Sequence, residues 1–143
     1  MTGEGLSREV KERLVEQALA ARANAYAPYS LILVGAAVLA DNGGTYTGCN
    51  VENASYGATM CAERVAMFAA VADGARAIRC LAVASSLEGP IAPCGMCRQV
   101  AAELGPDCVI LMSDPQGSYR ELSLRELLPV MFEHPAPDSA GRQ

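Results

Sequence analysis

Two short segments of the sequence carry side chains that can bind a metal ion and move protons. In the first, Cys61 stands two residues before Glu63; in the second, Pro93 precedes Cys94, and Cys97 follows three residues later. Two thiolates at a C-x-x-C spacing can share one Zn²⁺, and Cys61 would supply a third. Three protein ligands leave one coordination position open, as in catalytic zinc sites. The pattern predicts such a site with a carboxylate beside it.

Local signals place both segments at or near the N-termini of helices. Thr59 can cap a helix that runs to about Asp73, where Gly74 is a stop signal. A second helix is expected over residues 94–104, because Gly105 ends its apolar pattern. If both helix ends face the same region, the three cysteines can meet there.

Apolar runs elsewhere predict a mixed sheet covered by helices. A strand, a helix and a strand alternate in the second half of the chain, and this order implies a right-handed parallel crossover. Helices would then cover both faces, so we expect an α/β protein with three α/β/α layers. The expected strands are 31–40, 45–49, 78–85 and 108–113. A first helix is expected to be capped by Ser7 and to end near Tyr26. Residues 114–117 are expected to form a turn, and residues 123–126 a capping box that opens a short last helix.

The composition fits one globular domain and excludes some classes of partner. With 143 residues, 51% hydrophobic and 19% charged, we expect one catalytic domain over residues 1–134 and a flexible tail over 135–143. A net charge of −5 and eleven scattered Lys and Arg residues argue against a nucleic acid partner. No stretch approaches the roughly 20 apolar residues that span a bilayer, which argues against a membrane partner. A small substrate without phosphate groups fits this charge better.

The six cysteines are expected to be reduced thiols in a cytoplasmic protein. The N-terminal segment is polar and charged where a signal peptide would need an apolar core, so cysteine spacing indicates metal ligation and not disulfides. A closed structural zinc site would need a fourth ligand, for which the sequence offers Cys49, Cys80, Cys108 or His134. The chain would then be a non-catalytic, zinc-stabilised binding protein, and Glu63 would have no role.

Six motifs follow one another along the chain: Tyr26-Ala27-Pro28-Tyr29-Ser30, Val34-Gly35-Ala36-Ala37, Gly48-Cys49-Asn50-Val51-Glu52-Asn53-Ala54, Cys61-Ala62-Glu63-Arg64, Pro93-Cys94-Gly95-Met96-Cys97-Arg98-Gln99 and Glu126-Leu127-Leu128-Pro129. In this order they resemble the cytidine deaminase family over roughly Tyr26 to Phe132. A single C-x-x-C would be weak evidence, whereas an ordered set over most of the chain is highly specific. A Cys-x-Glu segment followed by Pro-Cys-x-x-Cys is also the general signature of zinc deaminases.

The resemblance implies zinc-dependent hydrolysis of the exocyclic amine of free cytidine or deoxycytidine, which yields the uridine and ammonia. Cys61, Cys94 and Cys97 would bind Zn²⁺ as the cofactor, and the metal would make water nucleophilic at neutral pH. Glu63 would carry protons from the water to the ring nitrogen and the leaving amine. Arg64 would donate hydrogen bonds to the ligand sulfurs and offset the negative charge of three thiolates on one Zn²⁺.

The same resemblance implies a homotetramer whose active sites share residues between subunits, and it assigns substrate contacts. The residues assigned in this way are Asn50 and Glu52 for the ribose hydroxyls, the backbone of Ala54 and Ala62 for sugar and base, and Tyr56 and Phe132 for contacts across subunits.

One position departs from the family pattern. Members usually carry an aromatic residue two positions after the serine of the first motif, where its ring lies against the pyrimidine. Ile32 stands at that position here. This substitution leaves an alternative open, a deaminase that prefers a modified cytosine nucleoside or another amino-substituted heterocycle.

Overall fold

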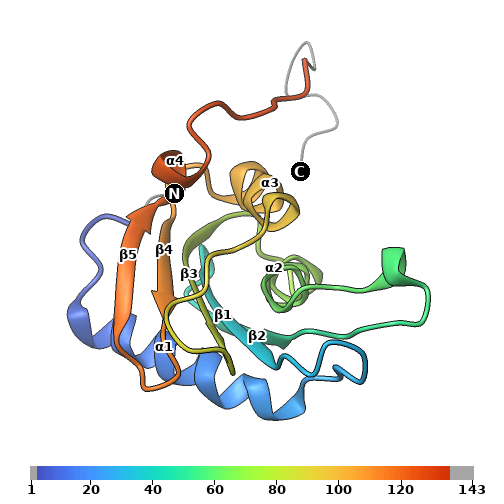
Figure 1. The fold of residues 1–143 in the computed structure, drawn as a ribbon. Helices are drawn as coiled ribbons and strands as arrows, with labels where there is room; N and C mark the ends of the chain where they lie inside the picture. The colour runs from blue at the N-terminus through green and yellow to red at the C-terminus, as the bar shows by residue number, and fades with distance from the viewer. Residues whose placement is uncertain (1–2, 136–143) are drawn as a thin grey trace.

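The computed structural model, which describes residues 3–135, contains one mixed five-stranded sheet with the order β2-β1-β3-β4-β5 (Figure 1). The strands are β1 (Val34–Ala40), β2 (Thr45–Cys49), β3 (Ile78–Ser85), β4 (Val109–Ser113) and β5 (Tyr119–Ser123). The helices are α1 (Arg8–Ala21), α2 (Ala62–Ala72), α3 (Gly95–Leu104) and α4 (Leu124–Leu127), with 3₁₀ turns at Arg22–Asn24 and Tyr56–Ala58.

Helices cover both faces of the sheet, which confirms the predicted three-layer α/β/α fold (Figure 1). On β3, Cys80, Ala82 and Ala84 belong to the core under α1, whereas Leu81 and Val83 belong to the core under α2 and α3. Both sets of side chains are buried. Because both faces of this strand are buried, polar and apolar residues do not alternate along it, and this explains the continuous apolar run in the sequence.

The predicted parallel crossover is present. Strands β3 and β4 pair in parallel, with Leu81 opposite Ile110, and α3 connects them. The other neighbours in the sheet are antiparallel, and β1 and β2 form the predicted hairpin. The crossover orients α3 so that its N-terminus follows the loop after β3, which is where the second cysteine segment lies.

A glycine brings α2 close to the hairpin. A Cβ atom at Gly48 would lie 2.5 Å from the amide nitrogen of Ala66 and 2.6 Å from the carbonyl oxygen of Ala62. Real Cβ atoms do not approach backbone this closely, so any larger residue would push the helix away. Gly48 therefore sets the distance between the first turns of α2 and the end of β2, which leads into Asn50.

Two predicted boundaries are wrong for local reasons. The first strand begins at Val34 and not at residue 31, because Leu31 has a φ of 64°, in the left-handed region that strands do not use. The helix expected to be capped by Thr59 begins at Ala62, with Cys61 as its N-cap. The Thr59 hydroxyl instead accepts a hydrogen bond from the Asn53 backbone at 3.1 Å.

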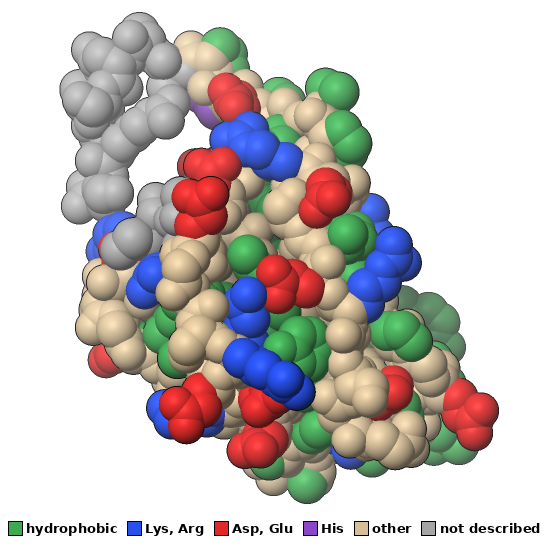
Figure 2. Space-filling view, turned by 90° about the vertical axis from the view of Figure 1, so that its left-hand side faces the viewer, with side chains coloured by type: hydrophobic (Ala, Val, Ile, Leu, Met, Phe, Trp, Pro, Cys, Tyr) green, Lys and Arg blue, Asp and Glu red, His purple; other side chains and the backbone are tan. Residues whose placement is uncertain are grey.

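Strand β5 was not predicted from the sequence. It follows the predicted turn and pairs antiparallel with β4 at the edge of the sheet, directly before the predicted capping box of α4. Its side chains are only partly buried or exposed, so it has no apolar run. Figure 2 shows acidic and basic side chains side by side on the side of the molecule that β5 borders in Figure 1. Lys11 pairs with Glu121 of β5 at 2.9 Å, and Arg125 pairs with Asp107 at 2.6 Å. Charge at an edge strand discourages pairing with another chain.

Residues 136–143, which make up almost all of the predicted tail, lie outside the described residues. Among residues 3–135, no helix combines the length and the apolar character needed to cross a membrane.

Candidate metal centre

Three cysteine side chains meet at the N-termini of α2 and α3. The Sγ atoms of Cys61 and Cys94 are 3.7 Å apart, those of Cys94 and Cys97 are 3.6 Å apart, and all three lie within 4.8 Å of one another. Cys61 is the N-cap of α2 and Cys94 is the N-cap of α3. A tetrahedral ion with Zn–S bonds of about 2.3 Å separates its sulfurs by about 3.8 Å. The three thiols therefore fit one zinc ion.

The cluster contains three candidate ligands and no fourth. None of the side chains considered as a fourth ligand belongs to it in the described part of the chain. Cys80 and Cys108 are buried in the core, which fits their place in apolar strand patterns. The arrangement matches a zinc site with an open position and not a closed structural one. Cys49 and His134, the other two side chains considered as a fourth ligand, also lie outside the cluster.

The surroundings favour thiolate at Cys61. A hydrogen bond from the Cys97 thiol, and then one from Arg64, lower the pKa of Cys61 to about 5 against the opposing effect of burial. The hydrogen bond to Cys61, and then burial, raise the pKa of the Cys97 thiol. Cys97 therefore keeps its proton and acts as the donor of that bond. A metal ion that bound here would replace the thiol protons.

Arg64 lies against the sulfurs, at the place that the family resemblance assigns to it. Its Nη2 donates to the Sγ of Cys61 at 3.3 Å, and the residue is 8% exposed. Its Nε is buried and has no hydrogen-bond partner. A guanidinium in this position offsets part of the charge of three thiolates around a divalent ion.

Glu63, in the first turn of α2, is 5% exposed and close to the cysteines. Burial, followed by the negative charge of Cys61, raises the pKa of Glu63 to about 7. A carboxyl group with a pKa near neutrality can both accept and release a proton at physiological pH. The arrangement thus places a buried carboxyl group of near-neutral pKa beside the candidate metal ligands.

Asn50 is buried at the end of β2 and holds the start of β1. Its Oδ1 accepts from the Val34 backbone at 2.9 Å, and its Nδ2 donates to the Ile32 carbonyl at 2.8 Å. A side-chain amide has two acceptor and two donor positions, so one of each is left for a ligand. Ile32 is half-buried beside it.

Glu52 is fixed by the loop that precedes β1. Its Oε1 accepts from the backbone of Tyr29 at 2.9 Å and of Ser30 at 3.0 Å, and its Oε2 accepts from the Ser30 hydroxyl. These bonds, that of the hydroxyl first, lower the pKa of the Glu52 carboxyl. A cavity of about 410 Å³ opens here, lined by Tyr29, Ser30, Glu52, Tyr56 and Thr59.

The other assigned residues differ in exposure. Tyr56 lies in the Glu52 cavity, where its ring is 6.0 Å from that of Tyr29 in an edge-to-face arrangement. Ala62 is fully buried and Ala54 is exposed. Phe132 is 69% exposed, and its carbonyl accepts from Gln99 on α3 at 3.2 Å.

Two residues that support the site were not singled out from the sequence. Ser30 joins Glu52 to the loop, as described above. Arg98 donates to the carbonyls of Pro93 and Leu127, both at 2.8 Å, and so ties the turn before Cys94 to α4. Both residues lie inside motifs of the family resemblance, but the bonds from Ser30 to Glu52 and from Arg98 to Leu127 join segments far apart in the sequence, and no local pattern indicates them.

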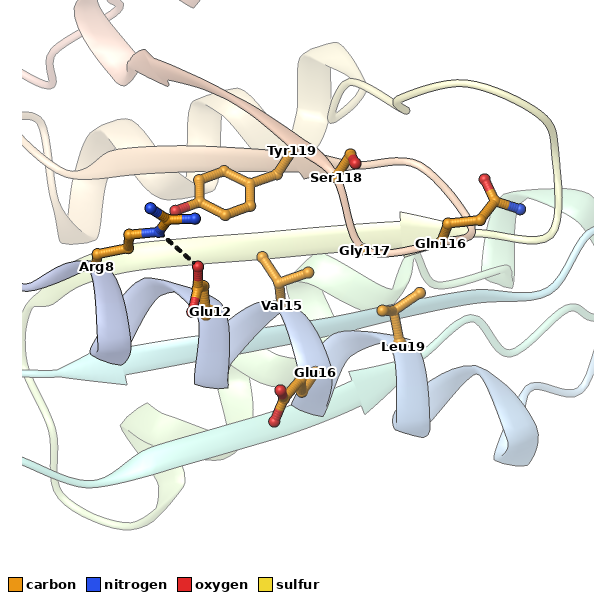
Figure 3. A pocket seen from close by; sticks show the side chains of 9 residues that line it. All are labelled: Arg8, Glu12, Val15, Glu16, Leu19, Gln116, Gly117, Ser118 and Tyr119. Carbon is orange, nitrogen blue, oxygen red and sulfur yellow. Dashed lines mark hydrogen bonds and ion pairs between the residues drawn. The ribbon is translucent and has the colours of Figure 1, made fainter.

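A second groove lies apart from the cysteines, between α1 and the β4–β5 turn (Figure 3). It has a volume of about 640 Å³, and Arg8 and Glu12, one turn apart on α1, form an ion pair at 2.7 Å along its edge. Val15 and Leu19 form its apolar side. None of the candidate metal ligands lines this groove.

Known proteins are similar to this chain in sequence and in fold. Residues 8–113 match the family described as the cytidine and deoxycytidylate deaminase zinc-binding region. Cytidine deaminases from Sporosarcina psychrophila and Halalkalibacterium halodurans are each 46% identical to the chain, covering 85% of it and 90% and 93% of those proteins. The crystal structure of cytidine deaminase from Burkholderia pseudomallei is 48% identical, with a TM-score of 0.81, over 89% of this chain and all of that one. The chain therefore belongs to the cytidine and deoxycytidylate deaminase family.

Proposed function

We propose that this protein is a zinc-dependent enzyme that hydrolyses free cytidine and deoxycytidine. Each turnover consumes one water, replaces the exocyclic amine by a carbonyl oxygen, and releases uridine or deoxyuridine and ammonia. The observation that carries this proposal is the set of three Sγ atoms at zinc-ligand spacing beside the buried carboxyl of Glu63. The relatives named above support the same activity.

The site residues have distinct roles in this proposal. Cys61, Cys94 and Cys97 hold the metal, and a bound Zn²⁺ supplies the Lewis acidity that makes water a nucleophile at neutral pH. Glu63 would take up the two protons of that water one after the other, delivering the first to the ring nitrogen and the second to the leaving amine. Arg64 holds positive charge against the sulfurs, which preserves the electron-withdrawing power of the site.

In this proposal, the loop after β2 and the loop before β1 hold the nucleoside beside the cysteine cluster. Asn50 and Glu52 bind the ribose hydroxyls through the hydrogen-bonding positions that their protein partners leave free. The backbone of Ala54 and Ala62 contacts sugar and base, and Ile32 lies against the base. Among residues 3–135, no Lys or Arg lines the Glu52 cavity, which agrees with a nucleoside without phosphate groups.

The function is tested by ammonia release from a panel of nucleosides. We expect the purified, zinc-loaded protein to release ammonia from cytidine and deoxycytidine, and the product to show the absorbance of uridine or deoxyuridine. A protein that binds zinc but releases no ammonia from any member of the panel would instead be a zinc-stabilised binding protein.

Ile32 supports one alternative, a preference for a base-substituted cytosine nucleoside or another amino-substituted heterocycle. Ile32→Phe is expected to raise kcat/KM on cytidine by up to about tenfold, because a flat ring stacks on the base better than a branched aliphatic chain. Kinetics of both proteins on cytidine, deoxycytidine and base-substituted cytidines measure this. If the wild type prefers a substituted base and the variant loses that activity, the alternative holds. Equal kinetics on every substrate would mean that Ile32 does not touch the base.

Arg64→Ala is expected to lower kcat about ten- to hundredfold while changing KM less, because the lost charge acts on the metal ligands and not on the substrate. Steady-state kinetics and zinc content measure the effect. Arg13→Ala is the matched control, since Arg13 is exposed on α1. A variant that changes only KM would show that Arg64 contacts the substrate directly.

We also propose that four chains assemble and complete one another's sites through Tyr56 and Phe132. The large exposed fractions of these rings, 76% and 69%, support an interface role. Light scattering is expected to give about 60 kDa, four times the chain mass of 14.9 kDa. Mixed tetramers of Glu63→Gln and Phe132→Ala chains are expected to be more active than either variant alone, because some sites then combine two intact residues. A monomer, or mixtures without recovery, would contradict sharing.

Two further expectations belong to the same proposal: the catalytic domain extends over residues 1–134, and the enzyme acts in the cytoplasm. The single sheet and its two cores within residues 3–135 support the first. The chemistry of the cluster supports the second, because three thiols stay available to a metal only where cysteines remain reduced.

A further inference from the structure

We propose that Ser30 is a positioning residue that orients the Glu52 carboxylate toward the sugar of the substrate. This inference rests on the proposed deaminase function. It concerns a hydroxyl that sits between the residue assigned to the ribose and the residue assigned to the base.

The direction of the hydrogen bonds at Ser30 follows from their partners. The Ser30 Oγ lies against the Glu52 Oε2 and 3.0 Å from the backbone nitrogen of Ile32. An amide nitrogen can only donate, and an ionised carboxylate can only accept. The Ile32 N–H therefore occupies a lone pair of the hydroxyl, and the hydroxyl proton is directed at Glu52.

The backbone around Ser30 keeps this arrangement in place. Leu31 has a φ of 64°, which is uncommon for a residue with a side chain and requires support from its surroundings. Its N–H donates to the Ala27 carbonyl at 3.0 Å. Beyond it, the Ile32 N–H bonds Ser30 and the Ile32 carbonyl accepts from Asn50. This left-handed residue turns the chain so that the Ile32 N–H points back to the Ser30 hydroxyl.

The two oxygens of Glu52 are held unequally. Oε1 accepts two backbone N–H groups, from Tyr29 and Ser30, whereas Ser30 supplies the hydrogen bond that the structure gives to Oε2. Without the hydroxyl, Oε2 would be released and the carboxylate could rotate about its remaining bonds. Glu52 then presents a less defined acceptor to a ribose hydroxyl, and the affinity for the sugar falls.

The test compares Ser30→Ala on a substrate with the 2′- and 3′-hydroxyls of the sugar and on one that lacks these two groups. Because hydrogen bonds to charged groups are stronger than neutral ones, we expect Ser30→Ala to lower kcat/KM on cytidine about tenfold, mainly through KM. On 2′,3′-dideoxycytidine, which lacks the 2′- and 3′-hydroxyls that Glu52 would bind, the loss should be less than about twofold. Ser30→Thr, which keeps the hydroxyl, should recover most of the activity on cytidine.

Two controls separate this role from a structural one. The first control is Ser118→Ala, on the β4–β5 turn, which should match the wild type on both substrates. The second is the state of Ser30→Ala itself, whose zinc content and melting temperature should equal those of the wild type. Equal losses on cytidine and dideoxycytidine, or no loss on cytidine, would overturn the positioning role. A wild-type protein that releases no ammonia from either substrate would overturn the proposed function and this role with it.

Discussion

Glu63→Gln is expected to lower turnover by a factor of about 10² to 10⁴, the range that general acid–base catalysis contributes. The glutamine has nearly the same size and fits the same buried position, but its amide cannot take up and release a proton at neutral pH. We therefore expect zinc content, fold and much of the nucleoside affinity to survive while kcat falls. Single-turnover kinetics separate the chemical step from nucleoside binding, and elemental analysis measures the zinc content.

The matched control for Glu63→Gln is Glu103→Gln, since Glu103 is exposed on α3 and lies outside the cluster. The control should keep wild-type turnover. If Glu63→Gln also kept turnover near the wild-type level with zinc bound, the assignment of Glu63 as the proton carrier would be wrong.

Cys94→Ala is expected to lose the metal and, with it, activity. The wild-type chain should hold one zinc ion, because the three sulfurs are close enough to share one and too close to bind three separately. Removing the Cys94 thiol leaves only two candidate ligands, Cys61 and Cys97. Since a metal that binds only the folded chain adds its binding energy to stability, the melting temperature should fall as well.

Elemental analysis of the purified variants gives the direct measurement. Cys49→Ala is the matched control, because Cys49 is a free thiol of intermediate exposure outside the cluster. It should keep one zinc per chain and full activity. Full zinc occupancy in Cys94→Ala would reject the ligand set, whereas zinc loss in both variants would indicate that Cys49 also binds the metal.

Much of this protein could be predicted from sequence because the relevant signals are local. The spacing of Cys94 and Cys97 already allows two ligands on one ion, and Gly105 ends the helix that carries them. The apolar run of β3 indicates a strand buried on both faces, and its alternation with α3 implies the parallel crossover. Each inference needs only residues that are neighbours along the chain.

Tertiary structure decided the features that depend on distant segments. Cys61 and Cys94 are 33 positions apart, and only the packing of α2 and α3 on one face of the sheet brings their sulfurs together. The left-handed Leu31 shortens the first strand, although its neighbours are apolar. The bonds of Glu52 to Tyr29 and Ser30 span more than twenty residues. Spacing along a sequence carries no information about such contacts, because they exist only once the sheet has placed the loops side by side.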